Sequence, residues 1–144
     1  VFVDALIWAP SAGNLQSRKF YFVTNKEMKE KLVHAALEQK FIAEAPLAIV
    51  CCADYNRVKH YGSRGTDLYC LQDVAASIQN LMLVATEAGL GTVWVGAFDE
   101  EKVSQCMKLS THLRPLAIIP IGYAAEIPKT KTRVEKEIAI EFVK

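Results

Sequence analysis

Apolar positions along the chain repeat with two different periods, which predict alternating helices and strands. Residues 2–7 place apolar side chains on one helical face, and this helix must end before Pro10 because the residue preceding a proline avoids helical backbone. Two more helices are predicted over residues 26–37 and 100–109, with Asn25 and Asp99 as their N-caps.

Four segments are rich in apolar and β-branched residues and are predicted strands. Residues 47–53 are continuously apolar, as expected of a central strand covered on both faces. The other three predicted strands are residues 19–24, 92–98 and 116–123. Residues 54–65, DYNRVKHYGSRG, are polar and irregular, and we predict a mobile surface segment there.

The longest apolar stretch predicts a helix in the core of the fold. Residues 66–88 are apolar nearly all round, and Gly89 or Gly91 can end the helix in a left-handed conformation. A membrane span is not expected, because polar groups within hydrocarbon are costly. The polar residues are Gln72, Asp73, Gln79, Asn80 and Glu87.

These elements predict one α+β domain over residues 1–144, in which helices pack on a mixed sheet in three layers. The sequence begins at Val1, within a helical pattern and without Met, which suggests that the natural chain begins earlier. The tail ends in alternating Ile138, Ile140 and Phe142. This alternation suggests that the tail pairs with something distant, and a second subunit is a natural candidate.

Charge and cysteine content argue against several classes of function. Seventeen basic and sixteen acidic residues leave a formal charge of +1, which gives no footprint for nucleic acid or an anionic membrane. The four cysteines lack Cys-x-x-Cys spacing and the three histidines are scattered, so we expect no metal site. Buried free thiols in a reducing cytoplasm are the better interpretation.

The sequence also lacks the common nucleotide and nucleophile motifs. No nucleophile elbow, Walker loop or dinucleotide-binding glycine fingerprint occurs. The glycines of GLGTVWVG lead from a helix into a strand, which is the reverse of the order that directs backbone amides at phosphate.

Three separated segments are unusual enough to suggest a ligand site. Residues 10–16 join a helix to a strand through Pro, Ser, Gly and Asn, residues 94–98 read WVGAF, and Lys131 and Arg133 lie in KTKTR. Each has an ordinary explanation: a plain loop, a bulge at Gly96, and a solvated charged face. Their joint presence favours a site.

The motifs APSAGNLQ, GLGTVWVGAFD and IGYAAEIPKTKTR, in this order and spacing, resemble the FMN-dependent nitroreductase family. The helix LQDVAASIQNLMLVA lies between the first two, and the resemblance covers essentially the whole chain. It implies a three-layer α+β fold with a mixed, mainly antiparallel sheet and a long central helix. It also implies a homodimer with two FMN molecules in the subunit interface, each held by both chains.

The resemblance implies roles for the first segment. Four of its residues would lie against the isoalloxazine ring and ribityl chain from the opposite subunit: Pro10, Ser11, Ala12 and Asn14. Gln16 would fix the loop or contact the cofactor. Asp73, a lone carboxylate on the long helix, is either a satisfied helix-interface group, which we favour, or a residue near the cofactor.

The other two segments would hold the flavin ring and the phosphate. Gly96 matches the position where backbone approaches flavin N5, and the N–H groups of Gly96 and Ala97 are candidate donors to the N5/O4 edge. Lys131 and Arg133 match the family's phosphate-binding pair. Further candidates for cofactor contact are Trp94, which could instead be a core residue, Val95, and Gln39 at the pyrimidine edge.

The implied activity is that of an FMN-dependent NAD(P)H oxidoreductase. A ping-pong scheme would pass hydride from NAD(P)H to flavin N5 and then to a flat, electron-poor acceptor such as a nitroaromatic or quinone. The flavin supplies the chemistry, so no catalytic side chain is expected. A non-catalytic flavin-binding or sensing domain and a plain dimeric interaction module are the alternatives. Residues that could contact an acceptor are Tyr55, His60, Tyr61 and Arg64.

Overall fold

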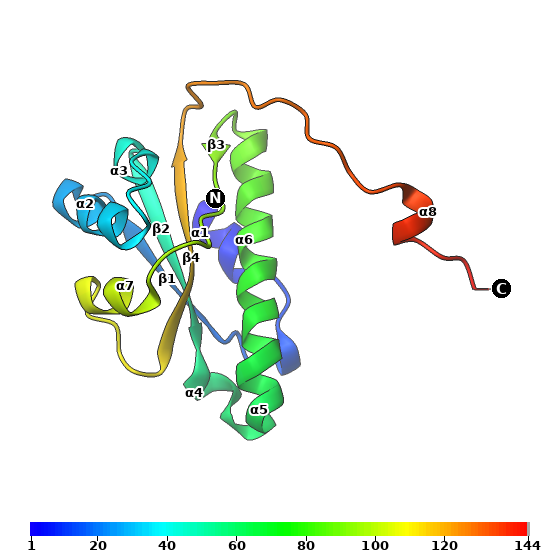
Figure 1. Cartoon of the computed structure of the whole chain (residues 1–144). Helices are drawn as coiled ribbons and strands as arrows, with labels where there is room; N and C mark the ends of the chain where they lie inside the picture. The colour runs from blue at the N-terminus through cyan, green and yellow to red at the C-terminus, as the bar shows by residue number, and fades with distance from the viewer. Residues whose placement is uncertain (144) are drawn as a thin grey trace.

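A four-stranded sheet in the order β1-β2-β4-β3 lies between two layers of helices (Figure 1). The computed structural model describes residues 1–143. The strands are Arg18–Val23 (β1), Leu47–Asp54 (β2), Gly91–Thr92 (β3) and Leu113–Gly122 (β4). All three strand pairings are antiparallel, so the part of the sheet within residues 1–143 is antiparallel rather than mixed. The α+β fold in three layers is confirmed.

The central position of β2 in the sheet explains why its sequence is continuously apolar. Ile49, Cys51 and Ala53 face one helical layer, built from α1 (Phe2–Ile7) and α6 (Cys70–Glu87). The alternate residues Ala48, Val50 and Cys52 face the other layer. Because successive strand residues point to opposite faces, a strand covered on both sides needs an apolar residue at every position.

The second helical layer consists of α2 (Lys26–Ala35), α3 (Phe41–Glu44) and α7 (Glu100–Cys106). The Asn25 side chain accepts a hydrogen bond from the Met28 N–H at 2.8 Å, and Asp99 accepts one from the Lys102 N–H at 3.0 Å. Both predicted N-caps are confirmed.

Helix α6 packs along the sheet through Val74, Ile78 and Leu81. Gly89 follows it with φ +72°, so Gly89 rather than Gly91 supplies the left-handed cap. The helical stretch Tyr55–Glu87 is long and apolar enough to cross a membrane by length and composition alone. Its packing on the sheet is that of a core helix.

Residues 54–65 are mostly helical, so the prediction of an irregular segment was wrong. Helix α4 (Tyr55–Val58), a 3₁₀ turn (Lys59–Tyr61) and α5 (Gly62–Arg64) follow one another, and a π-helical turn (Gly65–Tyr69) leads into α6. The anchor is Val58, which is fully buried in the core of the α6 layer. One fully buried apolar side chain in a polar stretch leaves no periodic signal.

The predicted strand 92–98 is much shorter in the structure. Only Gly91–Thr92 pairs with β4, and beyond it Val95 forms an isolated bridge with Ile118. Figure 1 shows the chain crossing from β3 to α7 along this path. Residues 93–94 and 96–97 are exposed.

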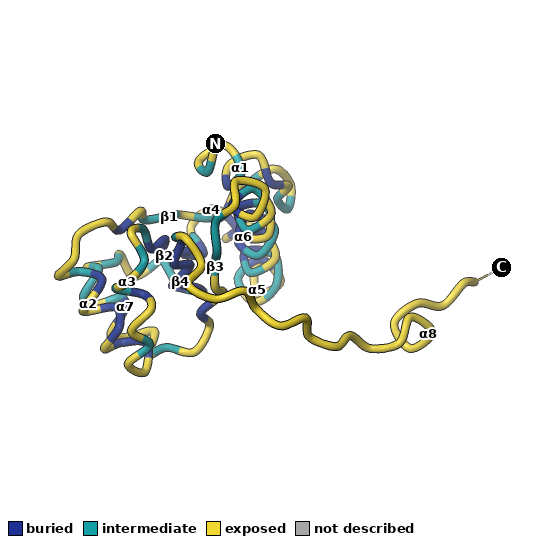
Figure 2. The backbone as a smooth tube through the Cα atoms, turned by 90° about the horizontal axis from the view of Figure 1, so that it is seen from above, coloured by how far each residue is buried: buried dark blue, intermediate teal, exposed yellow. Residues whose placement is uncertain are grey.

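The tail after β4 leaves the body of the molecule, as Figure 2 shows. Residues 123–143 are exposed throughout, and their one regular element is α8 (Lys136–Ala139). The alternating residues are uncovered within this chain, with Ile138 76% and Phe142 86% exposed. Residues 123–143 therefore have no place in the core of their own chain.

Candidate functional site

The loop between α1 and β1 has an unusual backbone. Gly13, Asn14 and Gln16 have φ of +56°, +55° and +53°, and residues 12–14 form a 3₁₀ turn. Ser11 Oγ accepts a hydrogen bond from the Gln16 N–H at 3.0 Å, and Gln16 Nε2 donates to the Asn14 carbonyl at 3.2 Å. Gln16 thus braces the loop, one of its two predicted roles. Three left-handed residues in four positions indicate a shape that the surroundings must enforce.

The buried carboxylate of Asp73 holds the loop against α6. Asp73 on α6 is 3% exposed. Its Oδ1 accepts a hydrogen bond from the Ala12 N–H at 2.9 Å, and its Oδ2 accepts from Ser17 Oγ at 2.6 Å and from the Ser17 N–H at 3.3 Å. Asp73 is therefore a hydrogen-bonded carboxylate at the interface between α6 and the loop, which is the interpretation that the sequence favoured.

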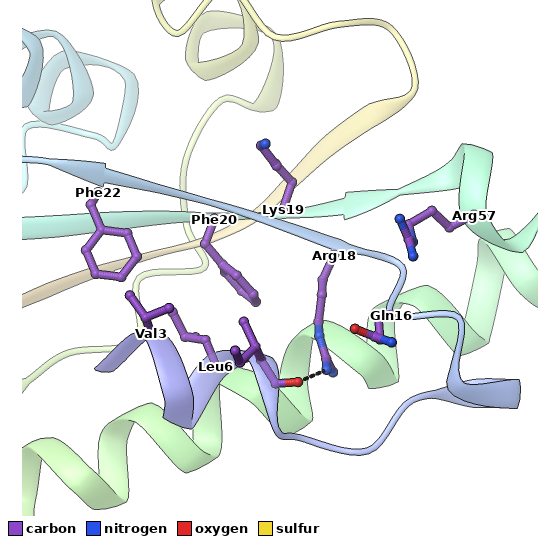
Figure 3. Close-up of a pocket in the computed structure, with 9 residues that line it drawn as sticks. Val3, Leu6, Gln16, Arg18, Lys19, Phe20, Phe22 and Arg57 are labelled. Atoms are coloured by element: carbon purple, nitrogen blue, oxygen red, sulfur yellow. Dashed lines mark hydrogen bonds between the residues drawn. The ribbon is translucent and has the colours of Figure 1, made fainter. Parts of the chain in front are cut away.

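Arg18 holds the carbonyls at the start of the loop. Its guanidinium donates to the carbonyl oxygens of Ile7 and Ala9, each at 2.8 Å, and of Pro10 at 3.1 Å. Burial lowers the pKa of the Arg18 guanidinium, and the charge of Asp73 opposes this shift. Figure 3 shows the Arg18 side chain reaching from β1 to the end of α1. Sequence reasoning missed Arg18 because its partners are backbone groups.

The helical segment after β2 covers the loop. Arg57 Nε donates to the Leu15 carbonyl at 2.6 Å. A Cβ added at Gly13 would overlap the hydroxyl oxygen of Tyr61, so this tyrosine lies directly over the loop. The Tyr61 ring packs on His60 and meets Tyr69 edge-on, with centroids 4.1 and 5.2 Å away. His60 and Tyr61, two of the four residues predicted to contact the electron-accepting substrate, thus lie at or beside the loop.

Arg64 and Tyr55 take different positions. Arg64 Nε donates to the Tyr69 hydroxyl at 2.8 Å, so Arg64 joins the same aromatic group. Tyr55 packs against the core of the α6 layer. Contact of either residue with an acceptor remains a prediction.

The segment around Gly96 presents free backbone donors. Within residues 1–143, the N–H groups of Gly96 and Ala97 donate to no protein acceptor. A Cβ added at Gly96 would meet nothing closer than the Trp94 ring at 3.9 Å, so this chain itself does not require glycine there. Trp94 is 42% exposed, which excludes the alternative that it fills the core of this chain.

The neighbours of these amides are fixed. Val95 is buried and exchanges two hydrogen bonds of 3.0 Å with Ile118 of β4. Gln39 Nε2 donates to the Ala97 carbonyl at 3.0 Å and to the Ala36 carbonyl at 2.8 Å. Gln39 therefore holds the Gly96 segment in place, and its contact with a cofactor remains a prediction.

Lys131 and Arg133 lie in the exposed tail. Arg133 donates only to the neighbouring carbonyls of Lys131 and Thr132, and neither residue forms an ion pair within residues 1–143. Because the tail leaves the body (Figures 1 and 2), a single chain does not gather the three predicted segments into one site.

A hollow of about 330 Å³ lies between α1 and the outer edge of β1 (Figure 3). It combines apolar side chains with cationic ones. Its lining residues are Val3, Leu6, Ile7, Gln16, Arg18, Lys19, Phe20, Phe22 and Arg57. Strand β1 pairs only with β2 in the described part of the chain, so its other edge is open at this hollow.

Comparison with known proteins identifies the family. The model of the nitroreductase family matches residues 1–47 and 31–123. The chain belongs to the nitroreductase family. The resemblance inferred from the three motifs is thereby confirmed, and the fold agrees with that of solved relatives.

Two relatives and one solved structure illustrate the likeness. A Methanothermobacter thermautotrophicus protein, provisionally named NADH dehydrogenase/NAD(P)H nitroreductase, is 34% identical over 133 residues, covering 90% of this chain and 66% of that protein. The FMN reductase [NAD(P)H] of Bacillus subtilis is 28% identical, covering 94% and 60%. The structure of B. megaterium NfrA1 has a TM-score of 0.87 at 26% identity, covering 98% and 63%. The chain thus spans about two thirds of the length of these proteins.

Proposed function

We propose that this nitroreductase-family chain binds FMN and acts as an NAD(P)H oxidoreductase that reduces an electron-poor acceptor, such as a nitroaromatic or a quinone, by a ping-pong scheme. Family membership and the names of the relatives support this proposal. The free donors at Gly96 and Ala97 are the single observation that carries it furthest. The four free cysteines fit a reducing, cytoplasmic location.

The Gly96 segment fits the edge of a flavin ring. Two adjacent amides without acceptors, beside a glycine that its own chain does not need, can receive a flat group bearing a nitrogen and a carbonyl oxygen. Val95 and Gln39 fix this segment from both sides, so its donors are oriented before a ligand arrives. Such preorganised donors stabilise negative charge that develops on a bound group.

The loop 10–16 can form a second side of the flavin site, in addition to the Gly96 segment. Its inward amides are held by Asp73, and Gly13 and Asn14 are exposed on its outer side. The predicted phosphate ligands, Lys131 and Arg133, are unpaired cations in the described part of the chain and can grip a phosphate.

We further propose that the site forms between two copies of the chain, because the tail that carries Lys131 and Arg133 leaves its own body. The open edge of β1 and the hollow beside it can receive the tail of a second copy, in which the non-helical residues 140–143 that follow α8 can pair with β1 as an added strand. Phe20 and Phe22 offer apolar surface to Ile138 and Phe142 of the tail. The tail's Glu137 and Glu141 would lie near the cationic residues of the hollow, which are Arg18, Lys19 and Arg57.

The protein's part in the chemistry is to bind and orient. Bound FMN would supply the redox chemistry by accepting a hydride and passing its electrons to the acceptor. The Gly96 and Ala97 amides would hold the edge of the ring where charge develops. The packed rings of His60 and Tyr61 beside the loop would orient a planar electron acceptor. Solvent would supply the protons.

The first test is the visible spectrum of the purified protein with added FMN, followed by anaerobic NADH and then NADPH. Flavin bands that bleach support both cofactor and activity. Bound flavin that does not bleach with either nucleotide refutes the NAD(P)H reductase and leaves the sensing domain. A protein that ignores FMN refutes the site altogether.

Variants then test the parts of the site. Gly96→Ala finds open space within its own chain, so the unfolding temperature of the FMN-free protein should not fall, whereas FMN affinity should. Arg133→Ala should weaken FMN binding by about 10–100-fold, the effect of losing a charge-assisted hydrogen bond. Lys129→Ala, another exposed cation of the tail, is the matched control and should stay near the wild type.

The subunit proposal is tested by sedimentation. Phe142→Asp should convert a dimer to a monomer, and Ile127→Asp, equally exposed in the tail but outside the alternating run, should not. A monomeric wild type, or a dimer unaffected by Phe142→Asp, would refute the proposed exchange of tails.

A further inference from the structure

We propose that Asp73 is a positioning residue of the flavin site: through Ala12 and Ser17 it sets the shape of loop 10–16 that meets the cofactor. The hold of Asp73 on the loop is independent of any ligand. Its consequence for flavin rests on the function proposed above.

The groups of the loop that meet the Asp73 side chain are all hydrogen-bond donors, so this position needs a hydrogen-bond acceptor. Asp73 lies on the apolar inner face of α6, where burying a charge is costly unless hydrogen bonds compensate it. Its three donors all come from the loop or its end, 56 and 61 residues away in the sequence. Two of these donors are backbone amides, the buried one of Ser17 and the half-buried one of Ala12, and one carboxylate accepts from both.

A neighbour on the same helix shows that anchoring alone does not need a charge. Ser77, one turn beyond Asp73, is fully buried and donates to the Leu6 carbonyl at 2.9 Å, which fastens α1 to α6. The side chains of α6 that hold α1 are neutral, since Asn80 Nδ2 also donates to the Ala5 carbonyl, at 3.4 Å. The loop instead engages a charged group, and charge-assisted hydrogen bonds are about twice as strong as neutral ones.

Asp73 and Arg18 divide the loop between them. Asp73 takes amides at positions 12 and 17, and Arg18 takes carbonyls at positions 7, 9 and 10. Two side chains of opposite charge therefore occupy these five backbone groups, while Arg57 takes the Leu15 carbonyl and Ser11 takes the Gln16 N–H. The exposed residues of loop 10–16 are Pro10, Gly13, Asn14 and Gln16.

The loop needs this support because its backbone is strained. A residue with a Cβ adopts the left-handed region at an energetic cost, which is smaller for Asn than for Gln, and the loop has one of each, Asn14 and Gln16. Such conformations persist only where the surroundings over-determine them. Without the carboxylate the loop should relax, and FMN would then have to order it on binding, which lowers affinity.

The test compares Asp73→Asn with Ser77→Ala. The first keeps the size of the side chain but replaces an acceptor oxygen with an NH₂ group, and the second removes the hydroxyl that fastens α1. Amide hydrogen exchange of the FMN-free proteins reads the loop directly. Asp73→Asn should accelerate exchange at residues 12–17 by about 10–100-fold with α6 unchanged, and Ser77→Ala should leave these amides near the wild-type rate.

Flavin binding is the second readout. Asp73→Asn should weaken FMN affinity by about 10–100-fold and alter the visible band shape of the flavin that remains bound, while Ser77→Ala should change affinity by less than about threefold. Ser17→Ala should weaken affinity less than Asp73→Asn. The double variant should be no weaker than Asp73→Asn alone, because both changes act on one contact.

Each outcome decides between the possibilities. A folded Asp73→Asn protein with wild-type loop exchange overturns the hold of Asp73 on the loop. Faster exchange with unchanged FMN affinity and spectrum overturns positioning and leaves a purely structural bond. If Asp73→Asn does not fold, Ser17→Ala carries the same comparison, and wild-type exchange and affinity there overturn the proposal. A wild type that binds no FMN refutes the proposed function, and with it the flavin part of this inference, while the exchange data still report the hold on the loop.

Discussion

Replacing Gly13 with alanine tests the contact between loop 10–16 and the helical segment that covers it. Gly13 has φ +56°, and a Cβ there would overlap the Tyr61 hydroxyl. Gly89 is the matched control, since it also adopts the left-handed conformation, with φ +72° in the C-cap of α6, and a Cβ there would have no neighbouring atom within 4 Å. The difference between the two variants therefore isolates the Tyr61 contact.

The expected magnitudes follow from these two terms. An alanine in the left-handed region costs about 1–2 kcal/mol, and any gain from a stiffer unfolded chain is the same for both variants. Tyr61 must also move, giving up its edge-on contact with Tyr69, a contact worth about 0.5–1.5 kcal/mol. We expect Gly89→Ala to lower the free energy of unfolding by about 1–2 kcal/mol and Gly13→Ala by about 1.5–3.5 kcal/mol.

Urea unfolding of both variants, with equal m-values, measures this difference. A Tyr61→Phe background supplies the decisive comparison, because it removes the overlapping oxygen and leaves the ring carbon Cζ at an ordinary 3.5 Å. In that background Gly13→Ala should cost no more than Gly89→Ala. Equal costs of the two glycine variants with Tyr61 present, or no relief by Tyr61→Phe, would refute the placement of this tyrosine over the loop.

Three further predictions concern the scaffold. Asn25→Ala should lower the free energy of unfolding by about 1 kcal/mol in urea titrations, because the α2 N-cap is lost. In thiol titration, half-buried Cys106 should react first, whereas Cys52 should react only on unfolding, because burial raises its pKa to about 12. The hydrogen bond from Arg114 lowers the pKa of Glu100, so the pair stabilises above the unfolded pKa and loses this effect as pH falls through the folded pKa. Glu100→Gln should therefore destabilise at neutral pH by less than about 1 kcal/mol, since both side chains are substantially exposed, and the difference from the wild type should shrink as pH falls below about 4.

Several features could be predicted because their causes lie within a few residues. The caps at Asn25 and Asp99 depend on amides three residues away, and the buried strand 47–53 needs only its own composition. The three motifs identified the family because their order along the chain is itself a sequence property.

Other features were misread because their causes are distant. The helical turns of residues 54–65 depend on Val58 entering a core built by other segments. The strand predicted over 92–98 is reduced to Gly91–Thr92 and a bridge at Val95, because only those residues meet β4. Local polarity and β-propensity carry no information about such contacts.

The sequence alone thus determined the family, the layers of the fold and the segments in which ligand-binding residues are expected, since each follows from local pattern or motif order. The tertiary structure decided how these segments are held. Asp73 was visible as a lone carboxylate, but its partners at positions 12 and 17 lie 61 and 56 residues away, and Arg18 binds carbonyls that any sequence would offer. Hydrogen bonds of a side chain to distant backbone leave no mark on periodicity, so only the folded chain shows which side chains shape the loop.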